Sequence, residues 1–289
     1  MTSQHTVTIA LVQMSMSSHC SANIKKAVTL VNKAAQRGAQ IVCLPEIFPF
    51  LYFPQEEKNE KWFSFAESIP GPTTTLLSTV AQEHKIVLIG GSIFEKSGTK
   101  YYNTSVVFNI NGKIMGRYRK VHIPHDPKFY EQHYFSPGDL GYCVCPTPYG
   151  KIAVLICYDQ WFPEAARIAT LRGAEIIFYP TAIGYIKDVD PEEGRNGNWH
   201  DAWETVQRGH AIANSVHIAA VNRVGSEGDL HFWGRSFIAA PFGKILAKGS
   251  DQEEIVMARC DLSEGKQVQE AWRFLHNRRP EMYKDLTKK

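Results

Sequence analysis

The segment best suited to chemistry in this sequence is an apolar run that ends in a cysteine. Residues 152–156 are typical of a buried strand, Cys157 follows directly, and a helix is predicted to begin at Pro163. Such a turn lifts a side chain out of the sheet, as in a nucleophile elbow, and would bring the backbone amide of Tyr158 near the sulfur. A core thiol would also fit this pattern. The polar Asp-Gln-Trp that follows favours a nucleophile.

Two charged residues stand where apolar surroundings are predicted. Glu46 follows a predicted strand, and burial there would disfavour its charged form, which suits a general base. Lys120 follows a predicted hairpin, and a cation at that point could lower the pKa of a thiol and stabilise an oxyanion. Each has a simpler explanation, because Glu46 could reach solvent and Lys120 could belong to a solvated basic turn. A second carboxylate, Glu131, lies in an aromatic loop.

These side chains must be positioned by a chain in which strand and helix signals alternate, which predicts an α/β fold. Helices are predicted over 22–36, 73–84, 163–171 and 199–214. Strands are predicted over 7–12, 40–44, 86–89, 101–110, 114–118, 151–156, 175–179, 216–221, 236–239, 244–247 and 254–260. The chain has no linker or repeat, so we expect a single domain over residues 1–289. Residues 185–198 are predicted to form a surface loop.

Composition excludes several classes of protein. The chain has 289 residues, 44% of them hydrophobic, and 32 basic against 29 acidic residues give a net charge of +3. These values exclude a disordered chain and argue against a dedicated nucleic-acid binder. The six cysteines do not form a disulfide framework, and Cys143-Val-Cys145 lacks a second pair at zinc spacing, so no metal is expected. Without a signal peptide or a membrane span, the sequence predicts a cytoplasmic protein.

Three motifs in order resemble those of the nitrilase, or carbon–nitrogen hydrolase, superfamily: Leu44-Pro-Glu46, Arg119-Lys120-Val-His122-Ile-Pro124 and Leu155-Ile-Cys157-Tyr-Asp159. The match runs nearly end to end. The resemblance implies a four-layer α-β-β-α sandwich and a catalytic triad that falls on Glu46, Lys120 and Cys157, with Glu131 as a second glutamate. It also implies self-association into a homodimer or higher oligomer. Residues from about 262 to 289 are then a C-terminal extension that packs on a partner subunit.

Four further segments are similar to one branch of that superfamily, the N-carbamoylputrescine amidases: 120–127, 134–139, 157–167 and 179–184. The resemblance implies hydrolysis of N-carbamoylputrescine to putrescine, carbon dioxide and ammonia through a cysteine thioester, with no cofactor. This reaction belongs to putrescine biosynthesis from arginine by way of agmatine. The Tyr158 amide would be an oxyanion donor.

The substrate of such an enzyme ends in an ammonium on a four-carbon chain. We expect Asp126 to meet the ammonium and Trp161 to line the chain, although Asp126 could equally cap the loop before Pro127. A related hydrolase acting on a carbamoyl amino acid or an aliphatic amide is the alternative, and Arg195 or Arg235 could bind a substrate carboxylate. A catalytically silent binding protein on the same fold is a further alternative, which possession of all three triad residues disfavours.

Overall fold

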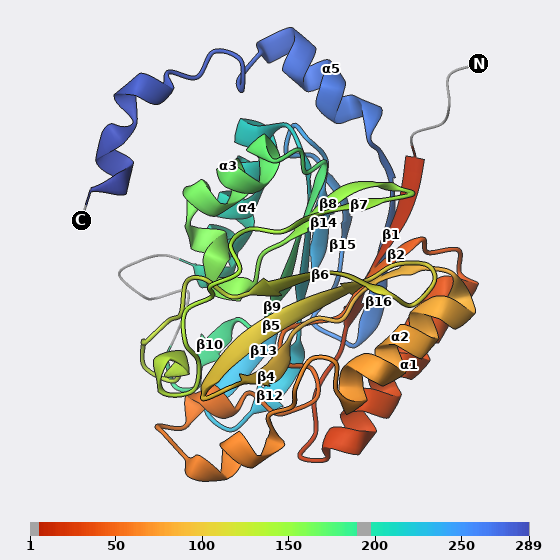
Figure 1. Cartoon of the computed structure of the whole chain (residues 1–289), viewed down its shortest axis with the longest axis vertical. Helices are drawn as coiled ribbons and strands as arrows, with labels where there is room; N and C mark the ends of the chain where they lie inside the picture. The colour runs from red at the N-terminus through yellow and green to blue at the C-terminus, as the bar shows by residue number, and fades with distance from the viewer. Residues whose placement is uncertain (1–5, 190–197, 289) are drawn as a thin grey trace.

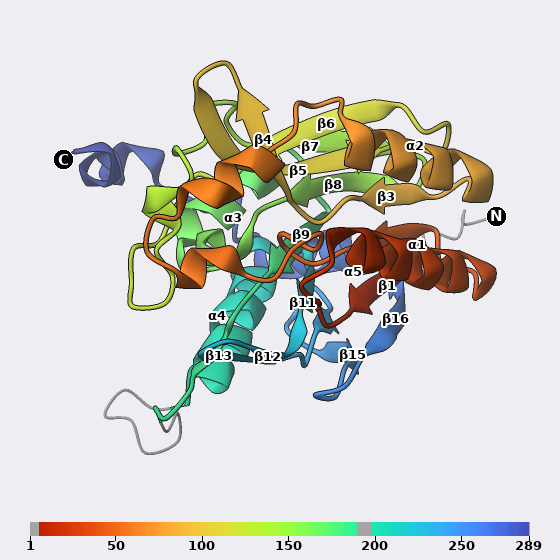
Figure 2. The ribbon, with the colours of Figure 1, turned by 90° about the horizontal axis from the view of Figure 1, so that it is seen from below.

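The computed structural model describes residues 6–189 and 198–288, and it contains two large β-sheets packed face to face. Helices cover the outer face of each sheet, which gives four layers in the order α-β-β-α (Figure 1). Figure 2 shows the same layers from a perpendicular direction. The fold class expected from the sequence is therefore confirmed.

The first sheet has seven strands and is built around three parallel ones. Its strands are β1 (Thr6–Gln13), β2 (Ile41–Cys43), β3 (Val87–Ile89), β4 (Ile93–Ser97), β5 (Lys100–Phe108), β6 (Ile114–Arg119) and β16 (Glu254–Asp261). Two helices, α1 (Cys20–Gln36) and α2 (Pro72–His84), cover its outer face. Gly38 follows the end of α1, as its position in the sequence predicts. The turn at Asn111-Gly112 joins β5 to β6, which the sequence also predicts.

The second sheet has six strands and again has a parallel centre. Its strands are β7 (Val144–Thr147), β8 (Gly150–Val154), β9 (Ile176–Thr181), β11 (His217–Asn222), β14 (Phe237–Ala239) and β15 (Ile245–Lys248). Its outer face is covered by α3 (Pro163–Leu171) and α4 (Trp199–Asn214). A small third sheet contains β10 (Gly184–Ile186), β12 (Val224–Glu227) and β13 (Leu230–Trp233).

The two large sheets are held together by a shared apolar core. Ile9 and Leu11 of β1 face inward toward Ile176 and Phe178 of β9, and all four side chains are fully buried. The alternate residues of β1 face the helices on the other side. Central strands are therefore buried on both faces, which explains why they form almost continuous apolar runs in the sequence.

Several elements differ from the sequence predictions. The bounds of α3 and α4 match the prediction, but β4, β7, β12 and β13 were not predicted. The prediction of a loop over residues 185–198 is wrong at its start, because Gly184–Ile186 forms β10 and pairs with β13. The rest of that segment, residues 190–197, lies outside the described residues. Strand β10 has only three residues and pairs with a distant hairpin, so the local sequence shows no clear alternation of apolar and polar residues.

The C-terminal residues leave the sandwich after β16. Helix α5 (Ser263–Trp272) has no buried residue, and the chain beyond it extends away from the sheets (Figure 1). It carries two short 3-10 turns, Pro280–Met282 and Lys284–Thr287. The single-domain organisation and the packing of this extension on a partner subunit stay predictions. No helix within the described part of the chain is long and apolar enough to cross a membrane.

The sandwich brings three strand ends together. Glu46 follows β2, Lys120 follows β6 and Cys157 follows β8, so the first two come from one sheet and the third from the other. Gly91, which follows β3, packs against the turn that carries Glu46. Its φ is +56°, and a Cβ placed there would lie 2.1 Å from the carbonyl oxygen of Pro45.

We therefore predict that Gly91→Ala destabilises the protein much more than Gly98→Ala. Both glycines have positive φ, so alanine costs about 1–2 kcal/mol at each from backbone strain alone. A Cβ at Gly98 meets nothing within 4 Å, whereas one at Gly91 displaces the backbone of Pro45. Urea denaturation should show a loss in the free energy of unfolding that is greater for Gly91→Ala by at least about 2 kcal/mol. Equal losses would contradict the close contact.

Candidate active site

The centre of the site is a lysine ammonium without exposure to solvent. Lys120 is fully buried, and its Nζ lies 2.8 Å from Oε1 of Glu46 and 2.8 and 2.7 Å from the two carboxylate oxygens of Glu131. These three acceptors match the three donors of an ammonium group. Burial alone would lower the pKa of Lys120, but the charges of Glu131 and Glu46 outweigh it and raise that pKa above its ordinary value. Lys120 is therefore cationic.

The two oxygens of Glu46 have different surroundings. Oε1 accepts hydrogen bonds from Lys120 and from Nδ2 of Asn103, at 2.8 Å each. Oε2 is buried and has no hydrogen-bond partner among the described residues. A buried carboxylate oxygen without a donor is costly unless a group that can donate arrives there. The free oxygen is thus available to accept a proton.

Arg223 fixes the backbone that carries Glu46. This fully buried side chain comes from the junction of β11 and β12 and donates to the carbonyl oxygens of Glu46 and Ile47, at 2.7 and 3.0 Å. These two bonds come from Nη2, and Nη1 donates hydrogen bonds to both carboxylate oxygens of Glu227, at 2.8 and 2.9 Å. Ile47 has a φ of +46°, which a branched residue rarely adopts. The guanidinium fork therefore holds a turn that the local sequence does not favour.

Glu131 lies on the short 3-10 turn Glu131–His133 and is fully buried. In addition to Lys120, it accepts a hydrogen bond of 2.7 Å from the hydroxyl of Tyr52. Burial raises the pKa of Glu131 to about 7, an effect that Lys120 opposes and Glu46 increases. Close to neutral pH, this carboxyl group can therefore either hold a proton or release it.

Cys157 stands at a sharp turn between β8 and the 3-10 segment Cys157–Trp161. Its φ is +44°, so the residue adopts the strained conformation expected of a nucleophile elbow. The thiol makes a weak hydrogen bond to the carbonyl oxygen of Ala182, at 3.8 Å. Burial raises the pKa of Cys157 well above its ordinary value, and Glu46 adds to the shift. Lys120 acts in the opposite direction without reversing it.

The expectation that a neighbouring cation leaves the thiol with a lowered pKa is therefore wrong. Lys120 is present, but its charge is already matched by two carboxylates, and the sulfur lies in a buried place. A neutral thiol in this position needs a base to remove its proton. The sequence predicts Glu46 as this base, and its Oε2 has no donor among the described residues.

Asp159 holds the turn after Cys157 in place. One carboxylate oxygen accepts from the Ile156 amide at 2.8 Å and from the hydroxyl of Tyr118 at 2.7 Å. The other accepts from the backbone amide of His122 at 3.1 Å and lies 2.7 Å from its ring Nδ1. Because Tyr118 and His122 flank Lys120 in sequence, this one buried carboxylate ties the lysine segment to the cysteine turn.

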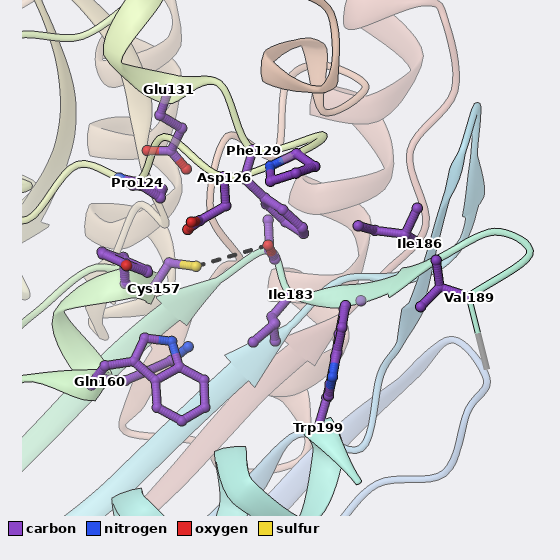
Figure 3. Close-up of a pocket in the computed structure, with 15 residues that line it drawn as sticks. Pro124, Asp126, Phe129, Glu131, Cys157, Gln160, Ile183, Ile186, Val189 and Trp199 are labelled. Carbon is purple, nitrogen blue, oxygen red and sulfur yellow. Dashed lines mark hydrogen bonds between the residues drawn. The ribbon is translucent and has the colours of Figure 1, made fainter. Parts of the chain in front are cut away.

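Cys157 opens onto a cavity of about 540 Å³, a size suited to a small molecule. Figure 3 shows Cys157 and Glu131 on one side of it, with Ile183, Ile186 and Trp199 across from them. Most of its described lining residues are apolar or aromatic: Pro124, Pro127, Phe129, Tyr158, Trp161, Ala182, Ile183, Gly184, Ile186, Val189 and Trp199. The described polar side chains that line it are Asp126, Glu131, Cys157 and Gln160.

The structure places Asp126, Trp161 and Tyr158 in the cavity wall. Their roles toward a substrate stay predictions. Among the described residues, the carboxylate of Asp126 has no hydrogen bond or ion pair. Its backbone carbonyl oxygen, and not its side chain, accepts from the amide of Phe129 at 2.8 Å. The side chain therefore does not cap this turn, and the capping explanation for Asp126 is wrong.

Of the two arginines suggested for a carboxylate-bearing substrate, only Arg235 belongs to the described residues, and it does not line the cavity. Its guanidinium lies 3.4 Å from the ring of His200. Arg195 lies outside the described residues. In the described lining, no lysine or arginine side chain faces the cavity. The described residues also contain no group of three or more His, Cys, Asp or Glu side chains able to hold a metal ion.

Sequence reasoning missed the residues that support this site. Tyr52, Asn103 and Arg223 each contact a carboxylate or its backbone from elsewhere in the chain, at separations too long for local patterns to reveal. Trp199 opens α4 and lines the cavity, although its place at a helix start gives no sign of this.

A family model for carbon-nitrogen hydrolase matches residues 8–270. The chain belongs to the carbon–nitrogen hydrolase family. It is 41% identical to the N-carbamoylputrescine amidase of Solanum lycopersicum, over 97% of this chain and 94% of that protein. It is also 38% identical to the citrullinase of Francisella tularensis, over 98% of this chain and 99% of that one.

Two further proteins extend the comparison. The omega-amidase NIT2-B of Xenopus laevis is 37% identical, over 95% of this chain and 96% of its own length. A carbon–nitrogen hydrolase from Helicobacter pylori, known from its crystal structure, has a TM-score of 0.93 and 41% identity, covering 99% of both chains. The fold and the hydrolase family are thus established, whereas the relatives differ in substrate.

For this hydrolase, we predict that Arg223→Lys lowers kcat by about 10- to 100-fold. The single ammonium of a lysine cannot replace the planar guanidinium, which bonds the carbonyl oxygens with one nitrogen and Glu227 with another, and Glu46 then shifts. The matched control is Arg117→Lys. In the unchanged protein, the guanidinium of Arg117 is partly exposed and lies 3.9 Å from Glu95. That variant should keep the kcat of the unchanged protein. Ammonia release measured under conditions where both variants are folded tests this. An unchanged kcat in Arg223→Lys would show that Arg223 does not position Glu46.

Proposed function

We propose that this protein hydrolyses the ureido group of N-carbamoylputrescine to give putrescine, carbon dioxide and ammonia. The observation that carries the proposal is a buried cluster of one lysine and two glutamates beside Cys157, at the wall of an apolar cavity with an unpaired carboxylate. Full-length similarity to N-carbamoylputrescine amidases supports it. The reaction would serve putrescine formation from arginine by way of agmatine, in the cytoplasm.

In the first half of the reaction, the free Oε2 of Glu46 takes the proton of Cys157 while the sulfur attacks the carbamoyl carbon. The carbon–sulfur bond forms as the carbonyl double bond opens to an oxyanion. The backbone amide of Tyr158 and the ammonium of Lys120 stabilise this oxyanion, and one good donor contributes about 3–4 kcal/mol. Lys120 can contribute because it makes two bonds to Glu131, one of which it can release.

Collapse of the tetrahedral intermediate breaks the bond between the carbonyl carbon and one of the two ureido nitrogens. The proton held by Glu46 goes to that nitrogen, which leaves as ammonia or as putrescine. The carbonyl group is then attached to Cys157 as a thioester. Glu46 or Glu131 removes a proton from an attacking water, and the carbon–sulfur bond breaks to release the thiol. Glu131 suits this step because its raised pKa, about 7, lets it exchange a proton near neutral pH. The remaining carbamic acid separates into carbon dioxide and an amine.

The cavity accounts for the rest of the substrate. Trp161, Phe129 and Ile183 offer apolar surface to a four-carbon chain. Asp126 is the lining carboxylate that is not engaged with Lys120, so it is available to the distal ammonium. A charge-assisted hydrogen bond of this kind contributes about 1.5–3 kcal/mol.

The alternative is a related hydrolase that acts on another N-carbamoyl compound or on an aliphatic amide. Citrulline is the sharpest competitor, because it carries the same ureido group and adds a carboxylate beside the distal ammonium. One observation favours it: the side-chain Nε2 of Gln160 is buried in the cavity wall without an acceptor. The described lining offers no cationic side chain for that carboxylate, which favours the decarboxylated substrate.

The test is ammonia release from N-carbamoylputrescine, citrulline and N-butylurea, which keeps the ureido group and four-carbon chain but lacks the ammonium. We expect the highest kcat/KM with N-carbamoylputrescine and no turnover by Cys157→Ala. Asp126→Asn should lower kcat/KM for N-carbamoylputrescine by about 10- to 100-fold and leave N-butylurea unchanged. Asp251→Asn, at an exposed carboxylate away from the cavity, is the matched control.

Each outcome decides a separate point. A preference for citrulline would replace the proposed substrate while keeping the reaction. An equal loss on N-carbamoylputrescine and N-butylurea in Asp126→Asn would remove charge recognition by Asp126. Turnover by folded Cys157→Ala would overturn the mechanism itself.

A further inference from the structure

Two cysteines outside the active site face each other at close range. Cys145 lies in β7 and Cys143 immediately precedes that strand, so their side chains point to the same face. The two sulfur atoms are 3.5 Å apart. Cys145 is only 2% exposed, whereas Cys143 is partly open to solvent. The pair therefore consists of one accessible sulfur and one protected sulfur behind it.

A glycine in the opposite sheet makes room for both sulfurs. Strand β7 lies against β6 at the edge of the sandwich (Figures 1 and 2). A Cβ placed on Gly116 of β6 would lie 2.3 Å from the sulfur of Cys145 and 2.8 Å from that of Cys143. Both thiols thus occupy the space that any other residue at this position would fill. The paired sulfurs are seated together by the packing of two sheets.

The surroundings give the two sulfurs different protonation. The two sulfurs share a hydrogen bond in which either can donate. With Cys145 as the donor, this bond lowers the pKa of Cys143 to about 7; burial opposes the shift, and the backbone amide of Arg117 and the charge of Arg172 favour it. The pKa of Cys145 is raised, because its proton is held by the neighbouring sulfur. The lowered pKa of the more exposed Cys143 favours its thiolate, which is the reactive form, beside a thiol that can donate a proton.

We propose that Cys143 and Cys145 form a peroxide-sensitive dithiol that closes reversibly to an intramolecular disulfide. The Cys143 thiolate attacks an oxygen of hydrogen peroxide; a sulfur–oxygen bond forms, the oxygen–oxygen bond breaks and hydroxide leaves. The resulting sulfenic acid is then attacked by the sulfur of Cys145. The sulfur–sulfur bond forms, the sulfur–oxygen bond breaks and the hydroxyl leaves as water with the Cys145 proton. In total, two thiols are oxidised and one peroxide is reduced to two waters.

The other cysteines lack this arrangement, and Cys20 provides a matched control. It is also partly exposed, but burial and the charge of Glu67 raise its pKa, and no second sulfur contacts it. The proposal does not depend on the substrate of the enzyme or on the role of Cys157. Its failure would leave the proposed function untouched.

The experiment treats the full-length protein with hydrogen peroxide at pH 7, alkylates the remaining thiols and maps the tryptic peptides by mass. Residues 129–151 form one tryptic peptide, which holds Cys143 and Cys145 and no other cysteine. We expect this peptide to become lighter by two hydrogens at least about ten times faster than Cys20 is oxidised. Dithiothreitol should restore its mass.

Two variants keep the result decisive. In Cys145→Ser, Cys143 should stop at the sulfenic acid and be captured by dimedone, and no disulfide should form. In Cys143→Ser, Cys145 should stay reduced, because it is buried and has lost its partner. Circular dichroism verifies that both variants are folded. Oxidation of the peptide no faster than that of Cys20, or dimedone capture at Cys145 in place of Cys143, would overturn the proposal.

Discussion

The burial of one ammonium group, that of Lys120, is the constraint on which the site depends. A charge removed from water costs several kcal/mol unless it is paired and hydrogen-bonded, and removal of one partner from such a pair costs about 3–5 kcal/mol. Lys120 meets this requirement with Glu46 and Glu131, which supply all of its acceptors. The lysine therefore draws two carboxylates to the side of Cys157, where neither would be stable without it.

This arrangement also sets the protonation of the site. The charge of Lys120 is balanced by the two carboxylates, so Lys120 does not hold Cys157 as a thiolate. Burial raises the pKa of Cys157 and favours the neutral thiol. In the proposed mechanism, the oxygen of Glu46 that lacks a donor accepts the proton of this thiol. The proposal therefore treats the cluster as a group that accepts and returns a proton, and not as one that lowers the pKa of Cys157.

The sandwich supplies the geometry that the charges need. Parallel strands place Glu46 and Cys157 at strand ends in two different sheets, and buried polar side chains tie those ends together. Asp159 joins the cysteine turn to the lysine segment, while Arg223 fixes the turn of Glu46. Both side chains do so through hydrogen bonds to backbone groups. The strained conformations of Cys157 and Ile47 persist because these contacts determine them.

Much of this could be predicted from the sequence. Apolar runs and turn residues predicted α3, α4 and the β5–β6 hairpin, and charges at strand ends indicated Glu46 and Lys120. What could not be predicted depends on long-range contacts. Tyr52, Asn103 and Arg223 carry no local sign that they contact a glutamate, and β10 exists because it pairs with β13. The pKa of Cys157 depends on the sum of burial and three charges, which no motif reveals.

The most direct test of the central claim is the rate at which iodoacetamide alkylates Cys157 at pH 7, in the unchanged protein and in Glu46→Gln. Mass mapping identifies the modified residue, and alkylation of Cys20 in the same samples is the internal control. If Glu46 must remove the proton from a neutral thiol, the variant should react about 100-fold more slowly at Cys157. An equal or faster rate in Glu46→Gln would contradict the account, because the thiol would then lose its proton without Glu46.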